Sequence, residues 1–162
     1  MRSRVGANGL PALRLSDTVR AGEDVIWREH GFGDVMDRIG LIGGMSWESS
    51  AEYYRLINRG VRDRLGGLHS AQCLLYSVDF APIEAMQRAG QWRELGVELA
   101  NIARTLENAG AAALLLCTNT MHKCASEIES AVRIPLIHIA DVTGEAIVAS
   151  GASTVTLLGT RF

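Results

Sequence analysis

The sequence predicts an α/β fold, a parallel doubly wound sheet with helices on both faces. From Arg38 onward, short apolar runs of strand length alternate with longer segments whose apolar residues recur every three or four positions. Strands that alternate with helices in this way pair in parallel, because each helix crosses one face of the sheet before the next strand begins. The chain has 162 residues and is 48% hydrophobic, which is enough for one core of ordinary size.

The first strand and helix are predicted between residues 39 and 65. The run IGLIG at 39–43 is continuously apolar and ends in glycine, as a buried parallel strand does. Ser46 is a suitable N-cap, and Glu48 favours the first turn of the helix that follows. This helix is predicted to end before two glycines, and its apolar face carries Tyr54, Ile57, Val61 and Leu65.

The same alternation continues to the end of the chain. Further strands are predicted at 73–78, 112–117, 134–139 and 154–159. Further helices are predicted over the segment with Trp92, Leu95, Leu99, Ile102 and Leu106, over 120–131, and over 141–150 with Asp141 at its start. The residues between the second strand and Trp92, Gln87 among them, are interpreted as a turn.

Composition and charge exclude several classes of function. The 16 basic and 18 acidic residues give a net charge of −2 without a basic stripe, so nucleic acid is not expected as a partner. The apolar runs are far shorter than the ~20 residues that span a bilayer, so no membrane partner is expected. Cys73, Cys117 and Cys124 are odd in number and match no zinc spacing, which predicts no metal site and a reducing, cytoplasmic location.

Residues 1–37 differ from the rest of the chain. They contain scattered glycines and arginines but no sustained period. A transit-like leader is disfavoured, because Glu23, Asp24 and Glu29 interrupt any basic face. We expect a disordered or non-native extension, and Met36 stands directly before the first predicted strand. The expected organisation is this extension, an α/β lobe over 38–152, and the start of a second lobe over 153–162.

Polar residues collect where the predicted strands end, which is where open parallel sheets bind ligands. These segments are GGMSWE, SVDF, CTNTMH, HIADVT and GTRF, and we expect them to converge on one site. The glycines do not fit G-x-G-x-x-G and no G-K-[ST] follows, so a nucleotide is not indicated. Close approach of the backbone to a small anion fits better: Gly43 and Gly44 let the chain turn, and the free N–H groups before the helix capped by Ser46 suit a carboxylate.

The CTNTMH segment is the second candidate for anion binding. Thr118, Asn119 and Thr120 offer side-chain donors and the first amides of the next helix. His122, one turn later, is placed to orient a neighbouring residue. Cys117 ends an apolar run and is interpreted as a small buried hydrophobic residue.

Four segments of the chain together resemble the aspartate/glutamate racemase family, the cofactor-independent amino-acid racemases. They are IGLIGGMSWESSAEYY, GGLHSAQCLLYSVDF, LLLCTNTMHK and PLIHIADVTG, in this order. The resemblance runs from Ile39 to the end of the chain and includes none of the first 37 residues. It implies a two-lobed protein of related α/β halves, of which this chain carries the first lobe and the first strand of the second.

The resemblance also implies a reaction. Such enzymes invert the α-carbon of aspartate or glutamate without pyridoxal phosphate, using two opposed acid/base groups, usually cysteines. In the family motif the first cysteine directly precedes Asn-Thr, but here Thr118 holds that position and Cys117 stands one place earlier. A shift of one residue on a strand turns the side chain to the other face. Thr118 is therefore the candidate acid/base, and unequal activity on the two enantiomers is expected.

The remaining residues implied by the resemblance contact the substrate, a small acidic amino acid. Asn119 and Thr120 would hold the α-carboxylate, and Gly44, Met45 and Ser46 would line the pocket beside them. Weaker candidates for binding the polar groups of the substrate are Gln87, Thr143 and Thr160. Supporting roles in the site are assigned to Cys117 and His122. The G-C-T-E-like motif with the opposing cysteine is not found in this chain, and the resemblance favours a homodimer. A truncated gene product, a fragment complemented by a second-lobe chain, and a half-site that binds without turnover remain open. The alternatives in function are a non-catalytic carboxylate-binding or partner-binding protein, and a decarboxylase or isomerase of the same superfamily.

Overall fold

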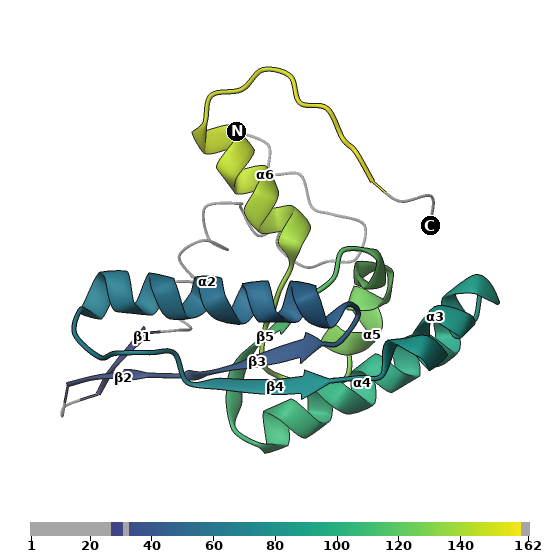
Figure 1. The fold of residues 1–162 in the computed structure, drawn as a ribbon, viewed down its shortest axis with the longest axis horizontal. Coiled ribbons are helices and arrows are strands. Elements are labelled where there is room, and N and C mark those ends of the chain that lie inside the picture. The colour runs from purple at the N-terminus through teal and green to yellow at the C-terminus, as the bar shows by residue number, and fades with distance from the viewer. Residues whose placement is uncertain (1–26, 31–32, 160–162) are drawn as a thin grey trace, which may run out of the picture.

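The computed structural model describes residues 27–30 and 33–159, with side chains described from Asp37 onward. Its main sheet has four parallel strands in the order β4-β3-β5-β6 (Figure 1). The strands are β3 (Arg38–Gly43), β4 (Cys73–Ser77), β5 (Ala111–Leu116) and β6 (Leu136–Ile137). The parallel sheet predicted from the sequence is confirmed.

Helices cover both faces of this sheet, as predicted. α2 (Trp47–Leu65) lies across one face, and α4 (Trp92–Asn108) crosses the other, with α3 (Phe80–Arg88) and α5 (Ala125–Glu129) packed beside it (Figure 1). A short 3-10 helix, η1 (Thr120–Cys124), joins β5 to α5. The last helix, α6 (Ile139–Ala149), projects away from the sheet, and none of its residues is buried.

The two faces of the sheet carry cores of different size. Successive strand residues point to opposite faces, so Leu41 packs on the α2 side and Ile42 on the α4 side. On the α4 side, Leu95 and Leu99 are fully buried within a large cluster. The α2 side holds a small cluster, in which Cys117 packs with Leu41. Because each buried large side chain contributes ~1.5–3 kcal/mol, most of the stability of the lobe comes from the α4 side.

Three predicted boundaries in the lobe were wrong. The segment interpreted as a turn after the second strand contains α3, whose N-cap Asp79 accepts a hydrogen bond from the Ala81 N–H at 3.2 Å. The helix predicted over 120–131 is divided into η1 and α5. The strand predicted at 134–139 is reduced to β6, because this is an edge strand and Pro135 has no N–H to extend the pairing.

Two segments outside the lobe also differ from the prediction. Residues 27–30 and 33–36, which were assigned to a disordered or non-native extension, form two paired antiparallel strands, β1 (Trp27–His30) and β2 (Gly33–Met36), each too short to show a period in the sequence. Residues 1–26 lie outside the described part. Residues 154–159 do not form the predicted strand and are exposed, since a strand needs a neighbour to pair with and no described strand lies beside them. None of the helices in the described ranges is long and apolar enough to cross a bilayer.

Candidate active site

The carboxyl ends of β3, β4 and β5 meet at one edge of the sheet, where a ligand site was predicted. The Val78 N–H donates to the Gly43 carbonyl at 3.0 Å, and the Cys117 N–H donates to the Ile42 carbonyl at 2.9 Å. These two bonds continue the backbone pairing past the ends of β4 and β5. The turns that follow the three strands therefore leave the sheet side by side.

The turn between β3 and α2 is closed by Ser50. The Gly44 N–H donates to Ser50 Oγ at 2.8 Å, and Ser50 Oγ donates to the Ser46 carbonyl at 3.1 Å. Glycine is required at position 44, because its φ is +91° and a Cβ there would overlap the Val78 carbonyl. Among the N–H groups before α2 that were expected to be free for a carboxylate, that of Gly44 is not free, because Ser50 already accepts its hydrogen bond.

Met45 and Ser46, which were expected to line the pocket, differ in exposure. Met45 is 5% exposed, and its side chain belongs to the core on the α4 side. Ser46 is the N-cap of α2, as predicted, but its side chain makes no capping hydrogen bond and is partly exposed. Of the two side chains, the Ser46 hydroxyl is the one that a ligand at this edge can reach.

The turn after β5 separates Cys117 from Thr118. Cys117 is fully buried on the α2 side of the sheet, whereas Thr118 is partly exposed. The Thr118 N–H donates to the Leu116 carbonyl at 2.9 Å, which turns the chain sharply at this point. Within the described residues, the Thr118 hydroxyl has no hydrogen-bond partner, and the Asn119 side chain is exposed and makes no capping bond to η1. These two side chains are therefore available at the edge.

The surroundings of Cys117 keep its thiol protonated. Burial raises the pKa of the Cys117 thiol to about 12, with a smaller contribution from Cys73. The pKa of Tyr53 in α2 is also raised, first by burial and then by Cys117. Because the thiolate is the reactive form, Cys117 has the properties of a small buried hydrophobic residue and not those of an acid/base group.

His122 connects the turn after β5 to the start of α6. Its Nδ1 lies 2.8 Å from the Thr118 carbonyl oxygen, and its Nε2 lies 3.4 Å from the Ile139 backbone nitrogen. The ring of His138 lies beside it, with the ring centroids 4.5 Å apart and the planes at 70°. Burial lowers the pKa of His122, and the neighbouring His138 lowers it further. His122 thus holds the backbone of the predicted acid/base residue against the next strand–helix junction.

The titratable groups that the structure describes at this edge are not arranged as a metal site. Within the described ranges, no group of three or more His, Cys, Asp or Glu side chains is placed to hold a metal ion. The two histidines at the edge use ring nitrogens for hydrogen bonds to the backbone: both nitrogens of His122, and Nδ1 of His138. Their hydrogen bonds stabilise the turn after β5 and the start of α6.

The structure gives Gln87 and Thr143 partners within the protein. Gln87 lies in α3 and not in a turn; it is 8% exposed, and its amide donates to Met121 Sδ at 2.8 Å. The Thr143 hydroxyl donates to the Ile139 carbonyl at 2.7 Å within α6. Thr120 begins η1 and is partly exposed, and Thr160 lies outside the described residues. Gln87 therefore supports η1 from the protein interior.

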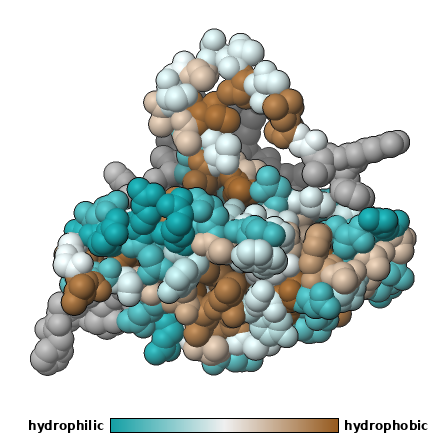
Figure 2. Space-filling view, viewed as in Figure 1, coloured by the Kyte–Doolittle hydropathy of each residue, from teal (hydrophilic) through white to brown (hydrophobic). Residues whose placement is uncertain are grey.

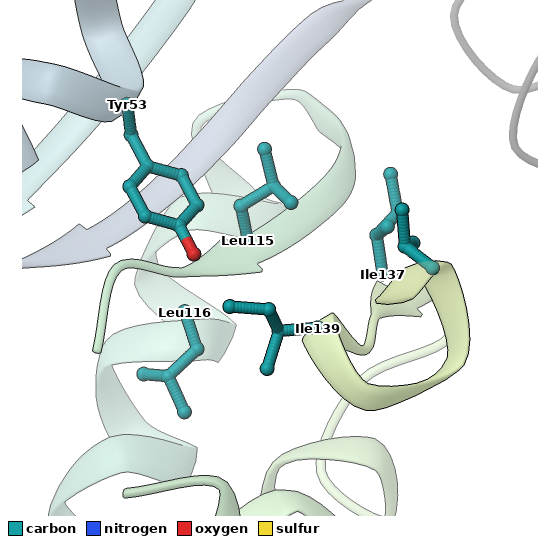
Figure 3. A pocket seen from close by; sticks show the side chains of 6 residues that line it. Tyr53, Leu115, Leu116, Ile137 and Ile139 are labelled. Atoms are coloured by element: carbon teal, nitrogen blue, oxygen red, sulfur yellow. The ribbon is translucent and has the colours of Figure 1, made fainter. Parts of the chain in front are cut away.

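Three cavities in this lobe do not suit an acidic amino acid. The first cavity, of about 210 Å³, has an apolar lining, so a carboxylate would lose its hydration there. Figure 3 shows this cavity, with the Tyr53 side chain pointing toward Leu116 and Ile139. The second, of about 440 Å³ beside β4, includes two carboxylates, Asp79 and Glu98. The third, of about 410 Å³, lies between α4 and α5, away from the edge. Thr118 and Asn119 line none of these three, so they stand at an open edge of the lobe.

Two residues at this edge have roles that the sequence analysis missed. Ser50 closes the turn after β3, and its only signal in the sequence is a serine four residues after the N-cap of a helix that follows two glycines. His138, and not Asp141, is the N-cap of α6, and its Nδ1 accepts from the Ala140 N–H at 3.1 Å. The polar residue directly after the last apolar strand was the signal for this cap.

Comparisons with known proteins agree with this architecture. The family model described as Asp/Glu/hydantoin racemase matches residues 42–162. A candidate Asp/Glu racemase from Yersinia pestis has a crystal structure with a TM-score of 0.75 and 53% identity over 78% of this chain. An aspartate racemase homologue from Pyrococcus horikoshii OT3 has a TM-score of 0.65 and 30% identity over 72%. An aspartate racemase from Picrophilus torridus, with a TM-score of 0.58 and 17% identity over 71%, shares the fold.

The solved structures are longer than the part of them that this chain matches. The chain covers 55% of the Yersinia pestis protein, 50% of the Pyrococcus horikoshii protein and 48% of the Picrophilus torridus protein, which is about half of each. The residues matched by the family model include the turns after β3 and β5. The chain therefore belongs to the Asp/Glu/hydantoin racemase family.

Proposed function

We propose that this chain is the first lobe of a cofactor-independent racemase for an acidic amino acid, and that Thr118 is its acid/base group. The observation that carries the proposal is the contrast between two neighbours at the end of β5. Cys117 is fully buried with a raised thiol pKa, whereas Thr118 is partly exposed and its hydroxyl has no hydrogen-bond partner within the described residues. Asn119, exposed beside it, supplies an amide for the substrate carboxylate.

In the proposed mechanism, two groups act on opposite faces of the α-carbon. A base on a second lobe takes the α-proton, and the electron pair of the broken C–H bond stays on the α-carbon and its carboxylate. The Thr118 hydroxyl gives a proton to the other face of the α-carbon and recovers one from water, while the protonated base of the second lobe releases the α-proton to water. A hydroxyl is a far better proton donor than base in this setting, because its alkoxide is strongly disfavoured at neutral pH.

This asymmetry has a defined kinetic form. The two enantiomers have equal free energies, so kcat/KM for net racemisation must be equal in both directions. The difference appears in solvent exchange at the α-carbon, where the second-lobe base can remove and return a proton on its own side without inversion. We therefore expect one enantiomer to exchange its α-proton faster than it is inverted, and the other to exchange only with inversion.

The proposal requires a second lobe over this edge, and the surface of the chain supports it. Val142, Val148, Leu157 and Leu158 are exposed by 49%, 71%, 94% and 88%. Figure 2 shows apolar side chains gathering over α6 and the segment that follows it. Exposed apolar side chains gathered in one region in this way are typical of an interaction site. The second lobe would come from a longer form of this protein, a complementing chain or a partner in a dimer, and the free cysteines suit a reducing, cytoplasmic location.

The test is α-proton exchange in a two-lobed protein. Joining this chain at residue 159 to the unmatched half of the Yersinia pestis relative supplies a second lobe. Each enantiomer of aspartate and glutamate is incubated in D2O, and proton NMR follows the loss of the α-proton while chiral chromatography follows inversion. Inversion accompanied by faster exchange of one enantiomer supports the proposal, whereas inversion with equal exchange of both would count against Thr118 as the first-face group.

The main alternative is a protein that binds a carboxylate without turnover. It is favoured by the open edge, where Thr118 and Asn119 line no cavity among the three described. Calorimetric binding of aspartate or glutamate to the two-lobed protein, with no deuterium entering the α-position, would establish this alternative and exclude a racemase.

A further inference from the structure

We infer that His122 is a positioning residue for the turn that carries Thr118, and that it acts as a neutral imidazole with its proton on Nδ1. This inference rests on the proposed function only in taking Thr118 as the acid/base group of the turn. Three observations support it: the backbone contacts of His122 on both sides of its ring, its packing against His138, and the placement of both rings at the first turn of α6.

The tautomer of His122 follows from its partners. A carbonyl oxygen can only accept, so Nδ1, at 2.8 Å from the Thr118 carbonyl, must donate. A backbone N–H can only donate, so Nε2, at 3.4 Å from the Ile139 nitrogen, must accept. Both requirements are met by one form of the ring, the neutral imidazole protonated on Nδ1. In this form the ring links the carboxyl end of β5 to the beginning of α6.

His138 completes the arrangement with the opposite tautomer. Its Nδ1 accepts from the Ala140 N–H at 3.1 Å, so its proton must be on Nε2. The Ile139 and Ala140 amides are the first two of α6, where four N–H groups lack partners within the helix. Two imidazole nitrogens thus satisfy two neighbouring amides at the positive end of the helix dipole, where a protonated ring would be disfavoured.

Protonation of His122 would break this link. Nε2 would then carry a hydrogen that faces the Ile139 N–H, and the ring would keep only the contacts of Nδ1 with the Thr118 carbonyl at 2.8 Å and the Asn119 carbonyl at 3.3 Å. Among the described residues, His138 is the titratable group on the neighbouring element that acts on His122. Lys123 follows His122 in η1, and its Nζ lies 3.8 Å from the centre of the Trp92 ring. The position of the turn therefore depends on the His122 imidazole remaining neutral.

The first test is the tautomeric state of each histidine in the full chain. Long-range proton–nitrogen NMR of the 162-residue chain at neutral pH should show His122 protonated on Nδ1 and His138 protonated on Nε2. Exposed His69, whose side chain makes no hydrogen bond within the described residues, is the internal reference. A His122 ring protonated on Nε2, or charged at neutral pH, would overturn the inference. This measurement needs no variant and no racemase activity.

The second test uses variants that divide the two contacts. His122→Asn keeps a side-chain donor near the Nδ1 position but has no group in place of Nε2, and His122→Phe removes both contacts; His69→Asn is the matched control. Amide hydrogen exchange at Ile139 should rise about tenfold in both His122 variants, the ratio expected for one lost hydrogen bond. The carbonyl carbon shift of Thr118 should change in the Phe variant and be retained in the Asn variant. Unchanged Ile139 exchange in both variants would refute the positioning role, and it would leave the racemase proposal untouched.

Discussion

Replacement of Ser50 by alanine tests how the candidate edge is held in shape. Ser50 is 3% exposed, and its hydroxyl accepts the buried Gly44 N–H at 2.8 Å. In Ser50→Ala the Gly44 N–H remains buried without this partner, which costs ~1–3 kcal/mol. The Ser46 carbonyl loses the hydrogen bond from the Ser50 hydroxyl but keeps the one from the Ser50 N–H at 3.4 Å, so the loss of this second bond adds little to the destabilisation. The expected loss in the free energy of unfolding is about 2 kcal/mol.

Urea unfolding followed by circular dichroism measures this loss, and a thermal melt should show a midpoint lower by ~4–8 °C for a chain of this size. The control is Ser49→Ala, because Ser49 lies in the same turn of α2, is partly exposed and makes no side-chain hydrogen bond within the described residues. Its expected effect is within ~0.5 kcal/mol. If Ser50→Ala were no more destabilising than Ser49→Ala, the reasoning about the closed turn would be refuted.

Three further outcomes are expected. The pKa of His122 is lowered in the folded chain from its ordinary value of 6.5, so as the pH falls the unfolded chain binds this proton before the folded chain does. The free energy of unfolding should therefore decrease as the pH drops below 6.5, and it should decrease less in His122→Phe. Urea unfolding at a series of pH values measures both effects. A thiol reagent should label Cys73 in the native chain before fully buried Cys117, and labelling of Cys117 at the same rate would contradict its burial. Leu99→Ala should cost ~2–5 kcal/mol and the exposed control Val97→Ala within ~0.5 kcal/mol, and similar losses in the two variants would contradict the core on the α4 side.

The alternation of strands and helices could be predicted from the sequence because it depends on local period. The strands β3, β4 and β5 and the helices α2 and α4 are long and strongly patterned, and their apolar residues form the two cores. α3 escaped prediction because it is short and contains Pro82, although Asp79 and the spacing of Ile83, Met86 and Gln87 were signals for it.

The candidate site was predictable as a location but not as a set of contacts. Parallel strands place their carboxyl ends at one edge, so the polar residues after β3 and β5 were expected to meet. The partner of the Gly44 N–H, in contrast, is Ser50, which is six residues later and which the geometry of α2 brings back over the turn. The link from His122 to Ile139 crosses 17 residues and depends on the packing of η1 against the start of α6. Such contacts depend on tertiary structure, which no local pattern records.

The most direct test of the account is inversion of the α-carbon by Thr118 variants of the two-lobed protein. Thr118→Ala removes the proposed first-face donor, and Thr118→Cys replaces it by a thiol that can act as both acid and base. Inversion should be lost in the alanine variant while one enantiomer still exchanges its α-proton, and the cysteine variant should invert both enantiomers with nearly equal exchange. Unchanged inversion in Thr118→Ala would contradict the central claim that Thr118 acts on one face of the substrate.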